Sequence, residues 1–266
     1  MARADRSTFL TLVAIFIAVC FFWNTPVVYP LKVLVVFLHE ISHGVAAVLT
    51  GGSIGHIQVN ANEGGECRAS GIRFVTLSAG YLGSMLAGAT LIVLASRTRL
   101  DRAICALLGG FLLLMTLLYV DRAENGFGWG FGLAAGTALI VAARALPERF
   151  ADLALKTIGL TSCMYAILDI KSDVIDRRGI GSDADMLADL THVPALIWGL
   201  LWIALALAVA FIALVLAAPG EGSAPAGEPA RAPASEPKPA GAAPALENAA
   251  ALLEDLARSL PPRGRP

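Results

Sequence analysis

The stretch LKVLVVFLHEISHGVAAVL, residues 31–49, decides the fold class. It is long enough to cross a bilayer, which takes about 20 mainly apolar residues. Only Lys32 and the polar segment HEISH at residues 39–43 interrupt its apolar run. Ionisable side chains are costly at membrane depth and normally face a bundle interior or a wet cavity. The stretch therefore predicts a membrane-spanning helix that carries a polar site inside a helical bundle.

The composition of the whole chain agrees with a location in lipid. Of the 266 residues, 56% are hydrophobic and only 15% are charged, with a mean hydropathy of +0.69. A soluble globular domain has roughly 45–50% apolar and about 25% charged residues, so a soluble enzyme is excluded. The net charge of -1 gives no electrostatic reason to expect a nucleic-acid partner. The four cysteines show no paired spacing, which excludes a disulfide framework: Cys20, Cys67, Cys105 and Cys163.

The apolar runs predict six or seven membrane-spanning helices, so the expected fold class is an all-α polytopic membrane protein. We interpret the first run, residues 8–23, as a retained helix rather than a signal peptide, because no small-residue cleavage site follows it. The run at residues 157–170 is shorter and carries Asp169 near its end. The remaining runs are residues 31–49, 74–96, 103–120, 126–143 and 191–218. Lys and Arg divide almost evenly between the two sides, so the positive-inside rule does not set the orientation.

The polar segments define the rest of the organisation. Residues 51–73 are rich in glycine, with apolar residues at roughly alternate positions, which predicts a short β-hairpin or loop after the HEISH helix. We expect residues 1–218 to form one membrane-embedded domain and residues 219–244 a disordered Pro/Ala-rich linker. Residues 245–266 are compatible with a short amphipathic helix and tail, or equally with a frayed polar tail.

The segment HEISH is an HExxH motif. Side chains four residues apart lie on the same face of a helix, so His39 and His43 can bind one metal ion together. Glu40 projects from nearly the same side and can take a proton from a metal-activated water. We therefore expect Zn²⁺ as the cofactor, with Glu40 as the catalytic base.

Two histidines leave a catalytic zinc site one ligand short, since such sites normally have three protein ligands. Asp169 is the preferred third ligand, because it closes an apolar run and so lies at membrane depth. Asp173, one helical turn later, is the alternative. Asp183 and Asp185 are interpreted as loop residues or as groups that orient the ligands. The remaining histidines, His56 and His192, are interpreted as solvated or interfacial residues.

Several short motifs resemble the site-2-protease class of intramembrane zinc metallopeptidases, the M50 family, and most closely its M50B-like branch. They are YPLK at 29–32, FLHEISHG at 37–44, NEGG at 62–65, AGYLGS at 79–84, LDIKSD at 168–173, GSDA at 181–184 and WGLLW at 198–202. The resemblance implies zinc held by His39, His43 and a distant aspartate, with Glu40 as the base. The family usually carries that aspartate before a glycine, whereas Ile170 follows Asp169 here.

The resemblance implies an endopeptidase that cuts a transmembrane segment of a membrane protein within the lipid bilayer, with the cell membrane as the expected location. The glycine-rich hairpin is expected to pair with the unwound substrate strand, so deleting it should abolish cleavage and leave zinc bound. Two alternatives remain at this point: a non-proteolytic membrane scaffold or partner-binding protein, and a small proton or metal transporter. The oligomeric state is not readable from the sequence.

Overall fold

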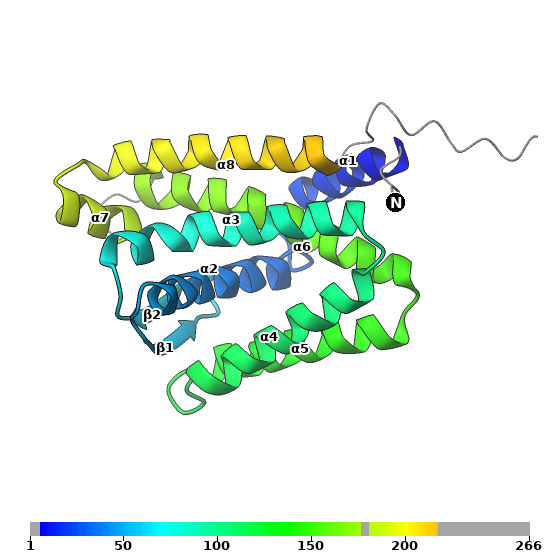
Figure 1. The fold of residues 1–266 in the computed structure, drawn as a ribbon, viewed down its shortest axis with the longest axis horizontal. Coiled ribbons are helices and arrows are strands. Elements are labelled where there is room, and N and C mark those ends of the chain that lie inside the picture. Colours follow the sequence, from blue (N-terminus) through cyan, green and yellow to red (C-terminus); the bar gives the residue numbers. More distant parts are fainter. Residues whose placement is uncertain (1–5, 177–180, 218–266) are drawn as a thin grey trace, which may run out of the picture. The chain divides into compact units, whose positions relative to one another are not determined.

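The computed structural model describes residues 6–176 and 181–217, which form a helical bundle with one small hairpin (Figure 1). The helices are α1 (Arg6–Phe21), α2 (Tyr29–Leu49), α3 (Arg73–Arg97), α4 (Asp101–Tyr119), α5 (Gly126–Ala145), α6 (Glu148–Lys171), α7 (Asp183–Thr191) and α8 (Ala195–Ala217). A π-helical turn, η1 (Ser172–Asp176), extends α6, and the hairpin consists of β1 (Ile54–Val59) and β2 (Gly65–Ala69). The predicted linker at 219–244 and the predicted helix and tail at 245–266 lie outside the described residues.

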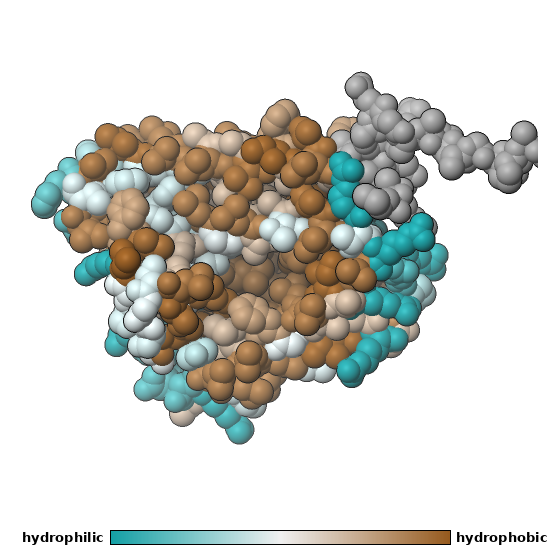
Figure 2. Space-filling model, viewed as in Figure 1, coloured by the Kyte–Doolittle hydropathy of each residue, from teal (hydrophilic) through white to brown (hydrophobic). Residues whose placement is uncertain are grey.

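Within the described residues, six helices are long and apolar enough to cross a membrane: α2, α3, α4, α5, α6 together with η1, and α8. The first predicted span corresponds to α1, which contributes a shorter apolar stretch, Phe9–Phe21. Figure 2 shows apolar side chains along the middle of the helices and hydrophilic ones gathered at the two ends. This distribution is what a bilayer requires of a bundle that crosses it. The expected all-α polytopic fold is confirmed.

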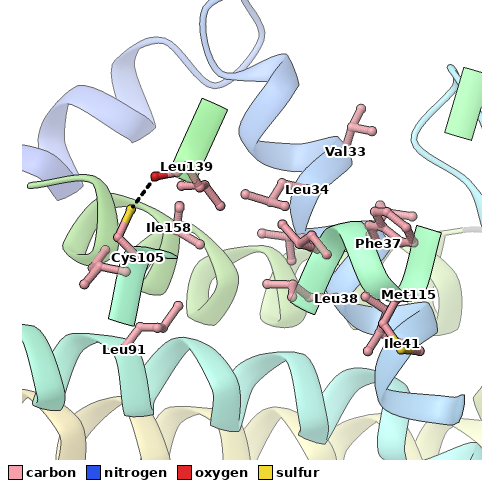
Figure 3. Close-up of a cluster of buried hydrophobic side chains, with 14 of the residues drawn as sticks. Val33, Leu34, Phe37, Leu38, Ile41, Leu91, Cys105, Met115, Leu139 and Ile158 are labelled. Atoms are coloured by element: carbon pink, nitrogen blue, oxygen red, sulfur yellow. Dashed lines mark hydrogen bonds between the residues drawn. The ribbon is translucent and has the colours of Figure 1, made fainter. Parts of the chain in front are cut away.

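Helix α2 occupies the centre of the bundle. Of an 18-residue apolar stretch of α2, 67% is buried inside the bundle, against 28% for the corresponding stretch of α4 and 22% for that of α8. It packs against α3, α6 and both strands of the hairpin. Figure 3 shows its apolar side chains, among them Val33 and Phe37, meeting side chains of α3, α4, α5 and α6 in one cluster. This close packing holds the HExxH motif on a rigid element.

The hairpin follows α2 directly and confirms the prediction for residues 51–73. Its strands pair antiparallel, with Ile57 opposite Cys67 and Val59 opposite Gly65. Ile57 and Val59 are fully buried and belong to the same apolar cluster as α2. Burial of one face of β1 therefore anchors the hairpin on the bundle, at the end where Figure 1 also places α7.

Two predicted boundaries are corrected. The run expected at residues 157–170 is part of a longer helix, because α6 begins at Glu148. The charged start of α6 is accommodated by an ion pair one turn apart, with Lys156 Nζ 2.6 Å from Asp152 Oδ1. The run expected to start at residue 191 starts at Ala195, since α7 ends at a left-handed residue, His192 (φ 60°). The polar segment before α8 is thus mainly η1 and the short helix α7.

Candidate metal centre

The two histidines of α2 and one aspartate of α7 form a compact cluster. His39 Nε2 lies 3.2 Å from Asp183 Oδ2, and His43 Nε2 lies 3.1 Å from the same oxygen. One ligand atom from each of the three residues lies within 4.8 Å of the other two. Helical spacing explains why the histidines face the same way, and the position of α7 explains why the carboxylate meets both.

Asp183 reaches the histidines because α7 starts beside them. Ser182 caps α7 in a capping box with Asp185, in which each side chain accepts a hydrogen bond from the other residue's backbone N–H. Asp183 is the first residue of the helix, and its carboxylate is buried. Burial by itself would raise the pKa of Asp183, but the neighbouring imidazoles outweigh it and hold this pKa well below its usual range. Asp183 is therefore an anion at neutral pH, as a metal ligand must be.

The donor set fits a zinc ion. Two imidazole nitrogens and one carboxylate oxygen are the ligand types of catalytic zinc sites, and ligands about 2.0–2.1 Å from a tetrahedral zinc lie roughly 3.3 Å from each other. The two separations to Asp183, 3.1 and 3.2 Å, are close to that value, and the two imidazole ligand atoms lie within 4.8 Å of each other. His43 Nδ1 donates a hydrogen bond to the Thr76 carbonyl oxygen at 2.7 Å. Because a carbonyl only accepts, that bond places a proton on Nδ1, and Nε2 is the nitrogen that faces Asp183.

Two glycines allow neighbouring backbone to approach the motif. At Gly80 of α3, a Cβ atom would collide with Nε2 of both histidines. At Gly65 of β2, a Cβ atom would collide with the carboxylate of Glu40. Any larger residue at these positions would have to displace the two imidazoles or the Glu40 carboxylate. The hairpin and α3 thus lie directly against the HExxH side chains.

The cluster opens into a cavity of about 530 Å³. Glu40 lies on its wall beside His39 and His43, and only 5% of Glu40 is exposed. The wall is formed by α2, the hairpin, α3, the end of α6 with η1, and α7. The cavity therefore brings a candidate metal centre and a candidate base together in a polar space inside an apolar bundle.

The model of one protein family, Peptidase M50B-like, matches residues 12–213. The chain belongs to the Peptidase M50B-like family. The match covers every helix from α2 to α7 and most of α1 and α8, so it includes the whole candidate site. Comparison with curated proteins and with solved structures gave no match. The six span-length apolar helices among the described residues make this M50B-like chain a multi-pass membrane protein.

The predicted site residues of the M50B-like chain do not all lie where the sequence analysis expects them. His39, Glu40 and His43 share the cavity as expected. Asp169, the preferred third ligand, lies on the cavity wall but outside the His39–His43–Asp183 cluster. Asp173, the alternative, accepts a hydrogen bond from the Tyr81 hydroxyl at 2.7 Å. The carboxylate that meets both imidazoles is Asp183, which the sequence suggested only as a loop or orienting residue.

The other candidates take supporting or distant positions. Asp185 serves the cap of α7. His56 lies on β1, and His192 lies at the exposed end of α7. Cys67 faces the cavity from β2, where burial raises the pKa of its thiol to about 12. Its thiol lies outside the His39–His43–Asp183 cluster.

Depth within an apolar run does not identify Asp183 as a site residue. That criterion favours Asp169, whose neighbours are apolar, and penalises Asp183, which follows Gly181 and Ser182. A different signal was present: Ser182 followed three residues later by Asp185 is a helix-capping pattern. It indicates a short helix whose first turn carries Asp183, within reach of the bundle end.

Proposed function

We propose that this M50B-like protein is a zinc-dependent intramembrane endopeptidase that hydrolyses a peptide bond in or near a transmembrane segment of a membrane protein. One observation carries the proposal. His39, His43 and Asp183 converge in a polar cavity that Glu40 also lines, within a bundle of six apolar helices. The cell membrane as the location, and a transmembrane segment as the substrate, stay predictions.

In the proposed reaction His39, His43 and Asp183 hold the zinc ion, and Asp183 takes the place that the sequence assigned to Asp169. When bound, zinc lowers the pKa of a water molecule toward about 7 and polarises the peptide carbonyl. Glu40 accepts the proton of the attacking water and delivers it to the leaving amine nitrogen. Its burial against Gly65 keeps the carboxylate directed along the cavity wall.

The substrate must present an unwound peptide bond, because a helical carbonyl is already hydrogen-bonded and lipid supplies no water. Strand β2 is suited to receive such a segment. The Val59 N–H points to Asn125 Oδ1 at 3.5 Å rather than to β2, so Val59 and Gly65 form a non-hydrogen-bonded pair. By alternation, the backbone groups of Gly65 and Cys67 face away from β1. Both residues line the cavity, so an extended substrate can pair with this edge.

Anchors at the hairpin tip support this role. Lys32 Nζ pairs with Glu63 Oε1 at 2.7 Å, and the Tyr29 hydroxyl donates to the Ala61 carbonyl oxygen at 2.7 Å. The tip is thereby tied to the first turn of α2. A rigid edge costs less ordering entropy when a peptide docks on it.

The proposed function is tested by zinc content and cleavage together, using purified full-length protein and a panel of single-span membrane reporter proteins in the same vesicles. We expect about one zinc per wild-type chain. His39→Ala should lose the zinc and the cleavage. Glu40→Gln should keep the zinc and lower the rate by about 10²–10⁴-fold, as expected for removal of a general base. A wild-type chain that binds no zinc after reconstitution would favour the scaffold alternative.

The strand-pairing step has its own test. Ile57 and Val59 are core residues, so deleting the hairpin would also damage the bundle. Cys67→Pro removes one outward-facing N–H, whereas Cys67→Ala shortens the same side chain and keeps that N–H. We expect Cys67→Pro to cleave more slowly than Cys67→Ala with equal zinc content. Equal rates in the two variants would refute strand pairing at this edge and leave the metal site untouched.

A further inference from the structure

Tyr81 lies directly beside the metal centre, although the proposed reaction gives it no part. It follows Gly80 on α3, and only 2% of it is exposed. Its ring meets the imidazole of His39 edge to face, with centroids 4.8 Å apart and planes at 81°. Such an arrangement is the favoured geometry of neighbouring aromatic rings. Tyr81 is therefore in contact with a candidate metal ligand on one side.

Two further contacts hold Tyr81 in place. Its hydroxyl donates a hydrogen bond of 2.7 Å to Asp173 Oδ2 in η1. Its ring also packs on Trp202 of α8, with centroids 5.2 Å apart. A buried phenol needs a hydrogen-bond acceptor, and here the acceptor belongs to the π-helical turn that ends α6. The ring is thus fixed by groups from two other elements.

The two histidines are held in different ways. His43 is oriented by its hydrogen bond to the Thr76 carbonyl oxygen. The ring of His39 contacts those of both His43 and Tyr81, with centroids 4.8 Å from each. Metal-binding imidazoles depend on such outer contacts to keep their nitrogen lone pair directed at the ion. For His39, the ring of Tyr81 supplies that contact.

We propose that Tyr81 is a positioning residue of the metal centre, whose ring sets the plane of the His39 imidazole and is itself held by Asp173. The proposal rests on the proposed metallopeptidase function. It gives Asp173 a role other than metal ligand: its Oδ2 atom accepts the Tyr81 hydroxyl. It also links η1 to the metal centre through one side chain, so displacement of this turn would tilt His39.

The test measures metal binding by the full-length protein in detergent, with Zn²⁺ and Co²⁺ as probes. Tyr81→Leu removes the ring, and we expect its zinc dissociation constant to rise by about 10–100-fold, as for other outer contacts of metal ligands. The Co²⁺ absorption bands should also shift, because they report ligand geometry. With zinc saturating, kcat on a cleaved reporter should fall and KM should stay constant. Wild-type zinc affinity and an unchanged Co²⁺ spectrum in Tyr81→Leu would overturn the proposal.

A second set of variants keeps the test decisive if Tyr81→Leu fails to fold. Tyr81→Phe keeps the ring and loses the hydroxyl, and Asp173→Ala loses the acceptor. Each should raise the zinc dissociation constant less than Tyr81→Leu does, and the double variant should lose less zinc affinity than the sum of the two single losses. Additive losses would overturn the proposal, as would complete loss of metal in Asp173→Ala, which would make Asp173 a ligand.

A matched control removes a comparable tyrosine hydrogen bond elsewhere. Tyr29→Phe loses the 2.7 Å bond to the Ala61 carbonyl oxygen at the hairpin tip, and the Co²⁺ spectrum should stay that of the wild type. A shift in this control equal to that of Tyr81→Phe would show a general loosening of the bundle and would refute a specific role for Tyr81. Failure of the proposed function has a different signature, a wild-type chain that binds neither ion.

Discussion

The end of α6 and the start of α7 both bring aspartates to the cavity, by different routes. Asp169 and Asp173 belong to a helix that crosses the bundle, and they lie on the cavity wall. Asp183 comes from a nine-residue helix outside the candidate membrane spans and meets both imidazoles. Asp183 therefore lies near the histidines because the short capped helix α7 begins beside them. The depth of an aspartate within an apolar run does not predict which aspartate meets the histidines.

Helix α7 is held by packing as well as by its cap. Ala184 and Leu187 are fully buried in a cluster with Tyr81, Ile170 and Trp202. These contacts come from α3, α6 and α8, so three membrane-spanning helices fix one short helix. Substitutions at the end of α6 and in α7 test the difference between these two regions.

The largest effect is expected from the aspartates themselves. Asp183→Ala removes a proposed ligand and should weaken zinc binding by more than the roughly 10–100-fold typical of outer contacts. Asp169→Ala should retain zinc within about twofold, because its carboxylate lies outside the cluster. Zinc content after dialysis against a chelator of known affinity measures both. If Asp169→Ala lost zinc and Asp183→Ala kept it, the third ligand would be Asp169 after all.

The next largest effect is expected from the apolar anchor of α7. Leu187 is fully buried, so Leu187→Ala should lower the free energy of unfolding by about 2–5 kcal/mol and weaken zinc binding with it. Leu190 lies on the same helix and is 44% exposed, so Leu190→Ala should stay within about 0.5 kcal/mol of the wild type. Denaturation in detergent compares the two. Equal losses would mean that packing does not position α7.

A smaller effect is expected from the helix cap. Ser182→Ala removes the side chain that accepts the Asp185 N–H and should destabilise the start of α7 by about 1 kcal/mol. If that energy is lost entirely from zinc binding, affinity falls about fivefold. Ser182→Thr keeps the hydroxyl and should retain most of the wild-type zinc affinity. A zinc titration of the three proteins is the measurement, and a Thr variant as weak as the Ala variant would contradict a role for the cap.

The smallest effect is expected from the exposed ion pair at the end of α6. Lys171 Nζ lies 2.6 Å from Asp176 Oδ2, and both side chains are about half exposed (53% and 49%). Exposed pairs contribute about 0–1 kcal/mol, so Asp176→Ala should leave stability within that range and zinc content unchanged. Thermal unfolding and metal analysis check this. A loss of zinc would show that η1 depends on this pair to hold its place beside the cavity.

Much of the fold was predictable because local patterns report it directly. Five of the six candidate spans coincide with long apolar runs of the sequence, and the glycine-rich segment with alternating Ile57 and Val59 predicts the hairpin. The sixth span, α6, is expected from the sequence only as the shorter run 157–170. The start of α6 was not predictable from hydropathy, since Lys156 and Asp152 lower the mean while neutralising each other in the helix. Mean hydropathy adds up residues one by one, so it does not register that two charges one helical turn apart form an ion pair.

The same distinction applies to the site. The spacing of His39 and His43 by itself determined that two imidazoles share one helix face with Glu40 beside them, because helical periodicity is a local property. Only the tertiary structure decided that Asp183 completes the cluster and that Tyr81 contacts His39, since both require α7 and α3 to lie against α2. Gly80 shows the physical reason: the backbone of α3 passes so close to both imidazoles that no Cβ atom fits there, so packing between helices selects which side chains meet.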